Sequence, residues 1–252
     1  MKIRFFGSTD TGRKRPFNED RFLCTELSGP APVSEPWVLL AVADGIGGHA
    51  AGEVASSMAM EILEKDVARQ RTAAGSGILS GQVLEESFIR ANREIFQKSA
   101  RTAELGGMGT TLAAALTDGR RSVAANVGDS RVYRIRGNDL IQISHDHSWA
   151  AEQRRGRGLT AQDISRSPFR NMVTRSIGYT ETILVDTFVL DLLPGDGVLL
   201  CTDGLHGSLT DAEILKAVRK HRDPGKASAA LLKAANKAGG RDNITAVIAW
   251  MD

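Results

Sequence analysis

The stretch WVLLAVADGIGGH, residues 37–49, joins seven consecutive apolar residues to one acid, three glycines and a histidine. An apolar run of this length suits a buried strand and is too short to cross a membrane. The strand would deliver Asp44 to its end, and the glycines would let backbone and ligand approach closely. A glycine-rich loop after a strand often binds phosphate, whereas an acid in front of that loop indicates a metal ion.

Length and composition are those of an ordinary globular protein. The chain has 252 residues, of which 42% are hydrophobic and 25% are charged, so it can bury a sizeable core. Lys and Arg number 32 against 30 Asp and Glu, a net charge of +2. That balance argues against a protein whose main task is to hold a polyanion, and we expect no nucleic-acid partner.

The location of the protein is predicted from missing signals. The start, MKIRFFGSTD, lacks the continuous apolar segment of a signal peptide, and no run is long enough to span a bilayer. Cys24 and Cys201 have no paired spacing, so we expect no disulfide framework. The sequence therefore predicts a cytoplasmic protein with no membrane partner, and we expect a monomer.

Short apolar runs closed by Gly, Asp or Asn predict a chain rich in strands. The expected strands cover 2–7, 20–26, 37–43, 110–117, 121–127, 131–136, 140–144, 184–190, 197–202 and 244–250. Apolar residues at helical spacing predict helices over 50–69, 82–99, 211–219 and 227–238. Asp118–Gly119 and Gly137–Asn138 are hairpin signals, and Thr210 with Glu213 fits a capping box.

Many strands with two separate pairs of helices indicate an α+β fold in which helices cover packed sheets. No linker or repeat divides the sequence, so we expect one catalytic domain over 1–252. Residues 150–172 show no clear period, and we expect there a mobile surface segment.

Acids recur where the predicted strands meet loops. They are Glu19, Asp20, Asp44, Asp129, Asp203 and Asp242. Any one of them alone would more often be a turn residue, as we expect for Asp118 and Asp139. Turns do not call for an acid at nearly every strand end, however, so the set as a whole favours a site. Clustered carboxylates repel one another unless a cation neutralises them, and oxygen ligands suit magnesium or manganese.

Arg15 lies four residues before Glu19, in GRKRPFNED. Beside a metal cluster its guanidinium would suit a bidentate grip on a phosphoryl group. Taken alone, Arg15 would more often be one more solvated cation in a basic turn with Arg13 and Lys14.

Eight short motifs, in order along nearly the whole chain, resemble those of the metal-dependent serine/threonine protein phosphatases, the PPM or type 2C class, in its bacterial form. The motifs are Gly12-x-x-Arg15-x-x-Asn18-Glu19-Asp20, Ala43-Asp44-Gly45-x-Gly47-Gly48-His49, Gly109-Thr110-Thr111, Asn126-Val127-Gly128-Asp129-Ser130-Arg131, Asp146-His147-Ser148, Thr174-Arg175-Ser176-Ile177-Gly178, Cys201-Thr202-Asp203-Gly204-Leu205 and Gly240-x-Asp242-Asn243-Ile244-Thr245.

The resemblance implies a four-layer α-β-β-α sandwich, with two antiparallel sheets flanked by helix pairs and two Mn²⁺ or Mg²⁺ ions at one end. By motif position Asp44 would bridge both ions, and the Gly45 carbonyl would bind one of them. Asp203 and Asp242 would hold the other. Glu19 and Asp20 would act mainly through bound waters, Asp129 with Asp203 would hold a third ion, and Arg15 would bind the phosphate.

The implied reaction is the hydrolysis of phosphoserine and phosphothreonine by a metal-activated water, without a phosphoenzyme. Animal-type members carry a histidine, the proposed general acid, directly after the Asp-Gly, where this chain has Ile46. His49 is a candidate replacement, with a helix-capping histidine and a metal-bound water as alternatives. His206 and Gly207 stand where many members have Trp-Asp.

Residues 150–172 take the place of the family's variable flap. From Gln153 to Arg175 this segment holds six arginines and one acid, Asp163, a net charge of about +5. Either the flap docks acidic phosphopeptide segments, or it is a solvated basic loop.

The resemblance also implies phosphoprotein substrates and a role opposing a bacterial serine/threonine kinase, with control of type VI secretion as one setting. Two other functions were weighed. The intact acids argue against a catalytically quiet phosphoprotein-binding regulator, and a metal-dependent nuclease lacks an aromatic stacking platform.

Overall fold

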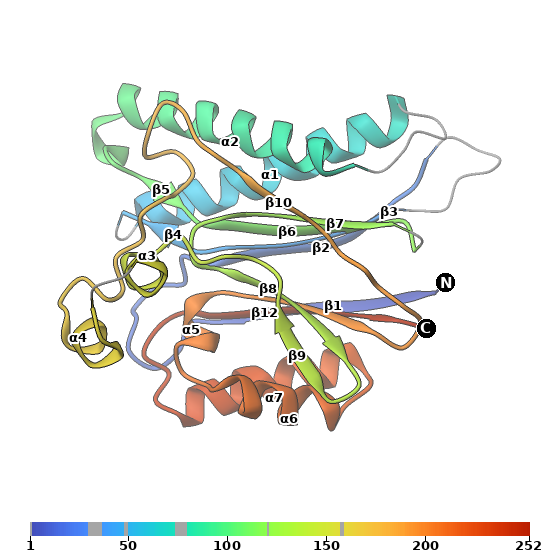
Figure 1. Cartoon of the computed structure of the whole chain (residues 1–252). Coiled ribbons are helices and arrows are strands. Elements are labelled where there is room, and N and C mark those ends of the chain that lie inside the picture. Colours follow the sequence, from blue (N-terminus) through green and yellow to red (C-terminus); the bar gives the residue numbers. More distant parts are fainter. Residues whose placement is uncertain (1, 30–36, 48–49, 74–79, 120, 157–158) are drawn as a thin grey trace.

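The computed structural model describes residues 2–29, 37–47, 50–73, 80–119, 121–156 and 159–252 (Figure 1). Its centre is a pair of antiparallel five-stranded sheets. The first sheet has the order β1-β12-β11-β8-β9, and the second has the order β10-β7-β6-β3-β2. This is the predicted α+β architecture of two packed sheets with helices on both outer faces.

The strands have the following bounds. In the first sheet they are β1 (Ile3–Asp10), β12 (Ile244–Met251), β11 (Gly197–Cys201), β8 (Arg131–Arg136) and β9 (Asp139–Gln142). In the second they are β10 (Asp186–Val189), β7 (Ser122–Val127), β6 (Leu112–Thr117), β3 (Trp37–Ala43) and β2 (Arg21–Leu27). A small third sheet pairs β4 (Gly45–Ile46) with β5 (Gly109–Thr110).

Helices form the two outer layers. The second sheet is covered by α1 (Ala50–Ala73) and α2 (Gly81–Arg101), and the first by α6 (Asp211–Arg219) and α7 (Pro224–Lys237) (Figure 1). The predicted capping box of α6 is present, since the Thr210 side chain accepts from the backbone N–H of Glu213. A short 3₁₀ helix covers Ala103–Leu105, and α5 (Asp203–His206) is a single turn.

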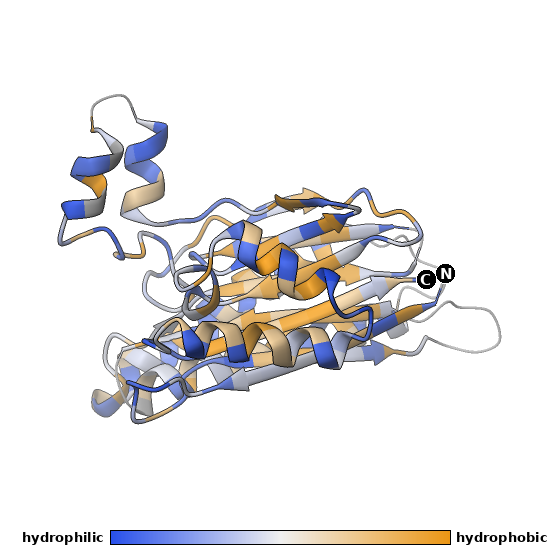
Figure 2. Cartoon of the chain, turned by 90° about the horizontal axis from the view of Figure 1, so that it is seen from below, coloured by the Kyte–Doolittle hydropathy of each residue, from blue (hydrophilic) through white to orange (hydrophobic). Residues whose placement is uncertain are grey.

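The wholly apolar β3 is explained by its central position. Every residue of β3 is buried, because one face packs on helices and the other on the opposite sheet. Leu39 and Ala41 belong to the cluster under α1 and α2, whereas Val38 and Leu40 belong to the cluster between the sheets. In Figure 2 hydrophobic residues run along the strands, whereas the helices in front of them carry both hydrophilic and hydrophobic residues.

The segment 150–172, in which the sequence shows no clear period, contains two short helices. They are α3 (Trp149–Arg155) and α4 (Ala161–Arg166). Their ends are fixed by capping: the Ser148 side chain accepts from Ala151, and Thr160 with Asp163 forms a capping box. Seven and six residues are too few, and too exposed, to show a hydrophobic period. Both helices project from the end of the sandwich opposite the chain termini (Figure 2).

Both hairpin predictions are confirmed, because β6 pairs with β7 and β8 with β9 across the expected turns. Cys24 and Cys201 are free thiols. None of the helices in the described ranges combines the length and the apolar character needed to span a bilayer.

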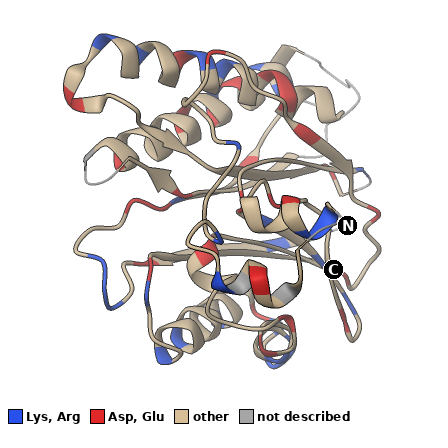
Figure 3. Ribbon diagram, turned by 60° about the vertical axis from the view of Figure 1, so that its left-hand side comes forward, with Lys and Arg blue, Asp and Glu red and all other residues tan. Residues whose placement is uncertain are grey.

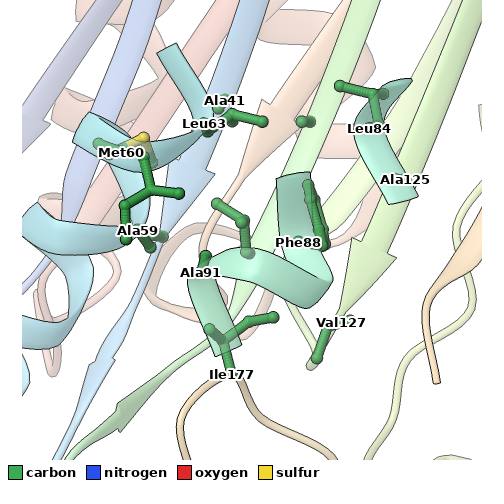
Figure 4. Packing of buried hydrophobic residues seen from close by; sticks show 14 of the residues in the cluster. Ala41, Ala59, Met60, Leu63, Leu84, Phe88, Ala91, Ala125, Val127 and Ile177 are labelled. Atoms are coloured by element: carbon green, nitrogen blue, oxygen red, sulfur yellow. The ribbon is translucent and has the colours of Figure 1, made fainter. Parts of the chain in front are cut away.

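The helix layer over the second sheet is anchored by Phe88, which is fully buried among Leu84, Ala91 and the alanines of the sheet (Figure 4). We expect Phe88→Ala to lower the free energy of unfolding by about 3–5 kcal/mol, because the truncation leaves a cavity in a close-packed layer. Chemical denaturation measures the change. Its neighbour Ile89 is 39% exposed, and Ile89→Ala should cost less than about 1 kcal/mol. Equal losses in the two variants would contradict this packing.

Candidate metal centre

The predicted acids meet at the end of the sandwich that carries α3 and α4. Asp44 follows β3 of the second sheet, whereas Asp203 follows β11 and Asp242 precedes β12 in the first. Asp20 lies on the connection from β1 to β2 and Asp129 on that from β7 to β8, and both of these connections cross from one sheet to the other. Figure 3 turns this end toward the viewer and shows acidic ribbon segments on the loops between the two halves of the sandwich.

A cavity of about 580 Å³ opens at this end. Predicted site residues in its wall are Arg15, Glu19, Asp44, Gly45, Asp129, Asp203 and Asp242. Met172 and Tyr179, from the segment after α4, add an apolar rim. Asp20 does not line the cavity but lies buried beneath it, where its charge acts on that of Asp44. The structure therefore brings together all predicted acids and Arg15. His49 lies outside the described residues.

Hydrogen bonds to two threonines fix the backbone of Asp44. The Asp44 N–H donates to Thr111 Oγ1 at 2.9 Å, and its carbonyl accepts from the Thr111 N–H at 2.9 Å and from Thr110 Oγ1 at 2.8 Å. Thr111 Oγ1 in turn shares a hydrogen bond of 2.7 Å with Ser130, next to Asp129. These bonds fix the acid at the strand end, a role that the Gly-Thr-Thr motif did not reveal from sequence.

Gly45 must be glycine because of its surroundings. A Cβ at this position would lie 2.3 Å from the Gly52 carbonyl oxygen and 2.9 Å from that of Glu19. The absence of a side chain lets β4, the first helix and the Glu19 segment pack against one another beside the cavity.

Asp20 is fully buried, and only one of its carboxylate oxygens is hydrogen-bonded. Oδ2 accepts from Thr202 at 2.8 Å and from Thr245 at 2.7 Å. Asp20 Oδ1 and Asp203 Oδ1 are buried and have no hydrogen-bond partner within the described part of the chain. A buried carboxylate oxygen without a partner is costly unless a cation accompanies it.

The carboxyl groups of the cluster favour the protonated state. Burial, followed by neighbouring acids, raises the pKa of Asp129 to about 7 and that of Asp203 to about 6. Burial raises the pKa of Asp20 to about 7, although two threonine hydrogen bonds oppose the shift. The pKa of Asp44 is raised well above its usual value by burial and then by Asp20 and Asp203.

One cation of the chain already touches the cluster. Arg15 Nη2 lies 2.8 Å from Asp242 Oδ2, and this hydrogen bond is the main reason that the pKa of Arg15 is raised. The Arg15 side chain is 51% exposed, so part of its guanidinium faces solvent. It therefore stands at the rim of the cavity rather than inside the cluster.

His206 has a role that sequence did not predict. Its Nε2 lies 3.0 Å from the carbonyl oxygen of Asp129, and burial lowers the pKa of His206 to about 4. A neutral imidazole can donate this bond, which ties α5 to the Asp129 loop. His206, which stands where many family members have tryptophan, thus helps to fix the backbone at Asp129.

The residues fit hard divalent cations by their chemistry. The acids offer oxygen ligands, Asp20 and Asp203 each have a buried unpaired oxygen within the described residues, and burial followed by neighbouring acids raises the pKa of Asp44. Within the described ranges, no three carboxyl, imidazole or thiol groups already surround one point as a finished metal site.

Comparison with known proteins decides the family. The model of the family described as protein phosphatase 2C matches residues 5–244. The chain belongs to the protein phosphatase 2C family. It is a metal-dependent serine/threonine phosphatase of the bacterial type, and the resemblance seen in the motifs is confirmed.

Relatives match over nearly their full length. The serine/threonine phosphatase stp of Listeria monocytogenes is 35% identical over 244 residues, which cover 97% of this chain and 94% of the relative. The structure of PppA, described as a key regulatory component of T6SS in Pseudomonas aeruginosa, has a TM-score of 0.81 and 31% identity, covering 99% and 98% of the two chains. The catalytic domain of the phosphatase PstP with two manganese ions has a TM-score of 0.77 and 29% identity, covering 98% and 97%.

The raised pKa values predict how the stability of the metal-free protein depends on pH. Asp20 and Asp203 have a usual pKa of 3.8, and in the folded protein their values are about 7 and about 6. Between these limits the folded state binds more protons than the unfolded state, so the free energy of unfolding should fall as pH rises from about 4 to about 7. Urea denaturation in the presence of a chelator measures the slope.

Asp203→Asn should flatten this slope, whereas the exposed turn variant Asp139→Asn should keep it. Saturating Mn²⁺ should stabilise the neutral-pH protein by about 2.7 kcal/mol at a hundredfold excess over its dissociation constant. A metal-free stability that is independent of pH would contradict the clustering of these acids.

Proposed function

We propose that the protein hydrolyses phosphoserine and phosphothreonine in proteins at a dinuclear Mn²⁺ or Mg²⁺ centre in the acid-lined cavity. The observation that carries the proposal is the buried carboxylate cluster, whose unpaired oxygens and raised pKa values call for compensating cations. The two manganese ions of the related PstP structure support the number of ions.

Each acid has a proposed place. Asp44 would hold both ions, with the Gly45 carbonyl for one and Asp203 and Asp242 for the other, and Glu19 would act mainly through bound water. Asp20 would act from below through water, since it is buried and does not line the cavity. Asp129, which lies beside Asp203, would complete a third site with it. When bound, the ions supply charge neutralisation and a water of lowered pKa for in-line attack on phosphorus.

Arg15 is the proposed phosphate-binding residue. Its half-exposed guanidinium lies at the cavity wall and is oriented by Asp242, so its remaining N–H groups can donate to two phosphoryl oxygens. Since Asp242 is also a proposed metal ligand, this ion pair would place the phosphoryl group against the centre.

The proton for the leaving serine or threonine oxygen has no assigned donor. Ile46, which lines the cavity, cannot supply one. His49 stays a prediction as the general acid, with water held at the centre as the alternative.

The apolar rim and basic surface beside the cavity suit a protein substrate. Arg175 is engaged by Asp186 at 2.9 Å, and Arg155 donates to the Asp146 carbonyl at 2.9 Å. The exposed Arg154, Arg166 and Arg170 make no ion pair with any residue that the structure describes. These three are the proposed contacts to acidic phosphopeptide segments, and Arg157 lies outside the described residues.

The proposed setting is a bacterial cytoplasm in which the protein, as a monomer, opposes a serine/threonine kinase. The related phosphatase stp supports the class of pathway. A role in type VI secretion rests only on the similarity to PppA. Phosphoproteomics after deletion of the gene should show sites whose phosphorylation rises, and an unchanged phosphoproteome would oppose the role.

Loss of a proposed ligand should abolish turnover. Asp44→Asn and Asp203→Asn should each lower manganese-stimulated release of phosphate from a phosphothreonine peptide by about a hundredfold or more. Chelator should abolish wild-type activity, and added Mn²⁺ should restore it. Asp139→Asn, an acid in a hairpin turn, is the matched control and should stay fully active. Near-normal activity of both site variants with intact circular dichroism would refute the site assignment.

Reversal of the flap charges should affect only large substrates. Replacing Arg154, Arg166 and Arg170 by Glu should lower kcat/KM on an acidic phosphoprotein about 5- to 20-fold, since exposed charge pairs contribute roughly 0.2–1 kcal/mol each. Hydrolysis of p-nitrophenyl phosphate should change less than about twofold.

The control for the flap variant reverses three exposed lysines of α6 and α7, Lys216, Lys233 and Lys237, which lie on the outer helix layer. Equal losses on both substrates, or an equal loss in the lysine control, would count against docking by the flap.

A further inference from the structure

A second cavity, of about 280 Å³, lies at the opposite end of the first sheet from the acids. Two strands that run from the acids to this cavity show how far apart the two sites lie. β12 begins two residues after Asp242 and reaches the cavity at Trp250, and β8 begins two residues after Asp129 and reaches it at Ile135. Eight residues of extended chain span about 25 Å. Whatever binds here cannot take part in chemistry at the acid cluster.

The cavity depends on a glycine in the middle of the sheet. Gly197 of β11 pairs with Trp250 on one side and with Ile135 on the other. A Cβ on Gly197 would lie 2.6 Å from Cζ3 of Trp250, so only glycine lets the indole lie across this strand. The ring thereby becomes part of the cavity wall.

Arg222 is held in place in that wall. Its guanidinium carbon lies 4.7 Å from the centre of the Trp250 ring, and Nη1 donates to the Gly195 carbonyl at 3.0 Å. The backbone carbonyl of Arg222 accepts from Arg4 at 3.1 Å. Stacking, side-chain and backbone bonds together order this guanidinium before any ligand arrives, which lowers the entropic cost of binding.

Hydrogen-bond donors predominate in the cavity. Arg219, exposed in the last turn of α6, lines it and has no ion-pair partner in the described ranges. Trp250 is only 2% exposed, and its Nε1–H is itself buried and has no acceptor in the described part of the chain, so the arginines and not the indole are the donors open to a ligand. The wall contains no acid. Nearby Asp196 and Asp252 are already paired with Arg136 and Arg4.

We propose that this cavity binds a small anion that carries a carboxylate or a phosphoryl group. Two guanidinium groups, one preorganised, suit planar or tetrahedral oxyanions, and Asn138 adds an amide at the mouth. A cationic ligand would face two positive charges without an acid to pair with. The distance from the acids makes the anion an effector or a structural ligand, not a substrate. This proposal does not rest on the proposed reaction.

The buried indole provides the experiment. The chain has three tryptophans, so a nitrogen–proton correlation spectrum of the full-length, ¹⁵N-labelled protein holds three indole signals. Trp250→Phe assigns the one from the cavity. Inorganic phosphate and succinate are added separately at constant ionic strength. The Trp250 signal should shift saturably with at least one of them, while that of Trp37, at the start of β3 in the second sheet, should stay in place.

Two variants test the guanidinium groups. Arg219→Gln, a change on an exposed side chain, and Arg222→Gln should each weaken the binding about tenfold or more, as expected for a lost charged hydrogen bond. Lys220→Gln, the neighbouring cation that does not line the cavity, should leave the affinity unchanged. Arg15→Ala should leave it unchanged too, which separates this cavity from phosphate bound at the acids.

The result also identifies the source of the anion. Saturation by phosphate alone assigns phosphoryl ligands, saturation by succinate alone assigns carboxylates, and saturation by both assigns oxyanions in general. A Trp250 signal that saturates with neither anion overturns the proposal. So does an affinity that Arg219→Gln leaves unchanged, because that variant preserves the stacked Arg222 and therefore the cavity wall.

Discussion

Repulsion between buried carboxylates is the constraint around which this end of the molecule is built. Asp44 stands in contact with the charges of Asp20, Asp129 and Asp203, and all of them have raised pKa values. A free chain would separate such groups, because each loses hydration and gains no counter-charge. The sandwich holds them together by fixing the backbone on either side of each acid. Divalent cations then convert an unfavourable cluster into a binding site.

Neither sheet could form the cluster alone. β3 brings Asp44 from the second sheet, and β11 and β12 bring Asp203 and Asp242 from the first. The apolar cluster between the sheets, in which Leu40 of β3 packs with Leu200 of β11, sets their spacing. The apolar packing between the sheets thus stabilises a fold in which the buried carboxylates are held close together despite their repulsion. The acid cluster therefore depends on close sheet-to-sheet packing.

Hydrogen bonds from hydroxyl and imidazole groups fix the positions of three of these acids. Thr111 fixes the Asp44 backbone, Thr202 binds one oxygen of Asp20, and His206 binds the Asp129 carbonyl. Each leaves carboxylate oxygens free for a ligand. In this member of the protein phosphatase 2C family, the acid cluster lies at the end of the sandwich from which the short helices α3 and α4 project.

What the sequence by itself determined follows from local rules. The apolar run of β3 predicted a central strand with Asp44 at its end, and Thr210 with Glu213 predicted the start of α6, because burial and capping act over a few residues. The tertiary structure alone decided how residues far apart in sequence meet. Arg15 pairs with Asp242 across 227 positions, and His206 reaches Asp129 across 77. Such contacts depend on how the two sheets pack, and a local pattern of side chains does not determine which distant residues meet.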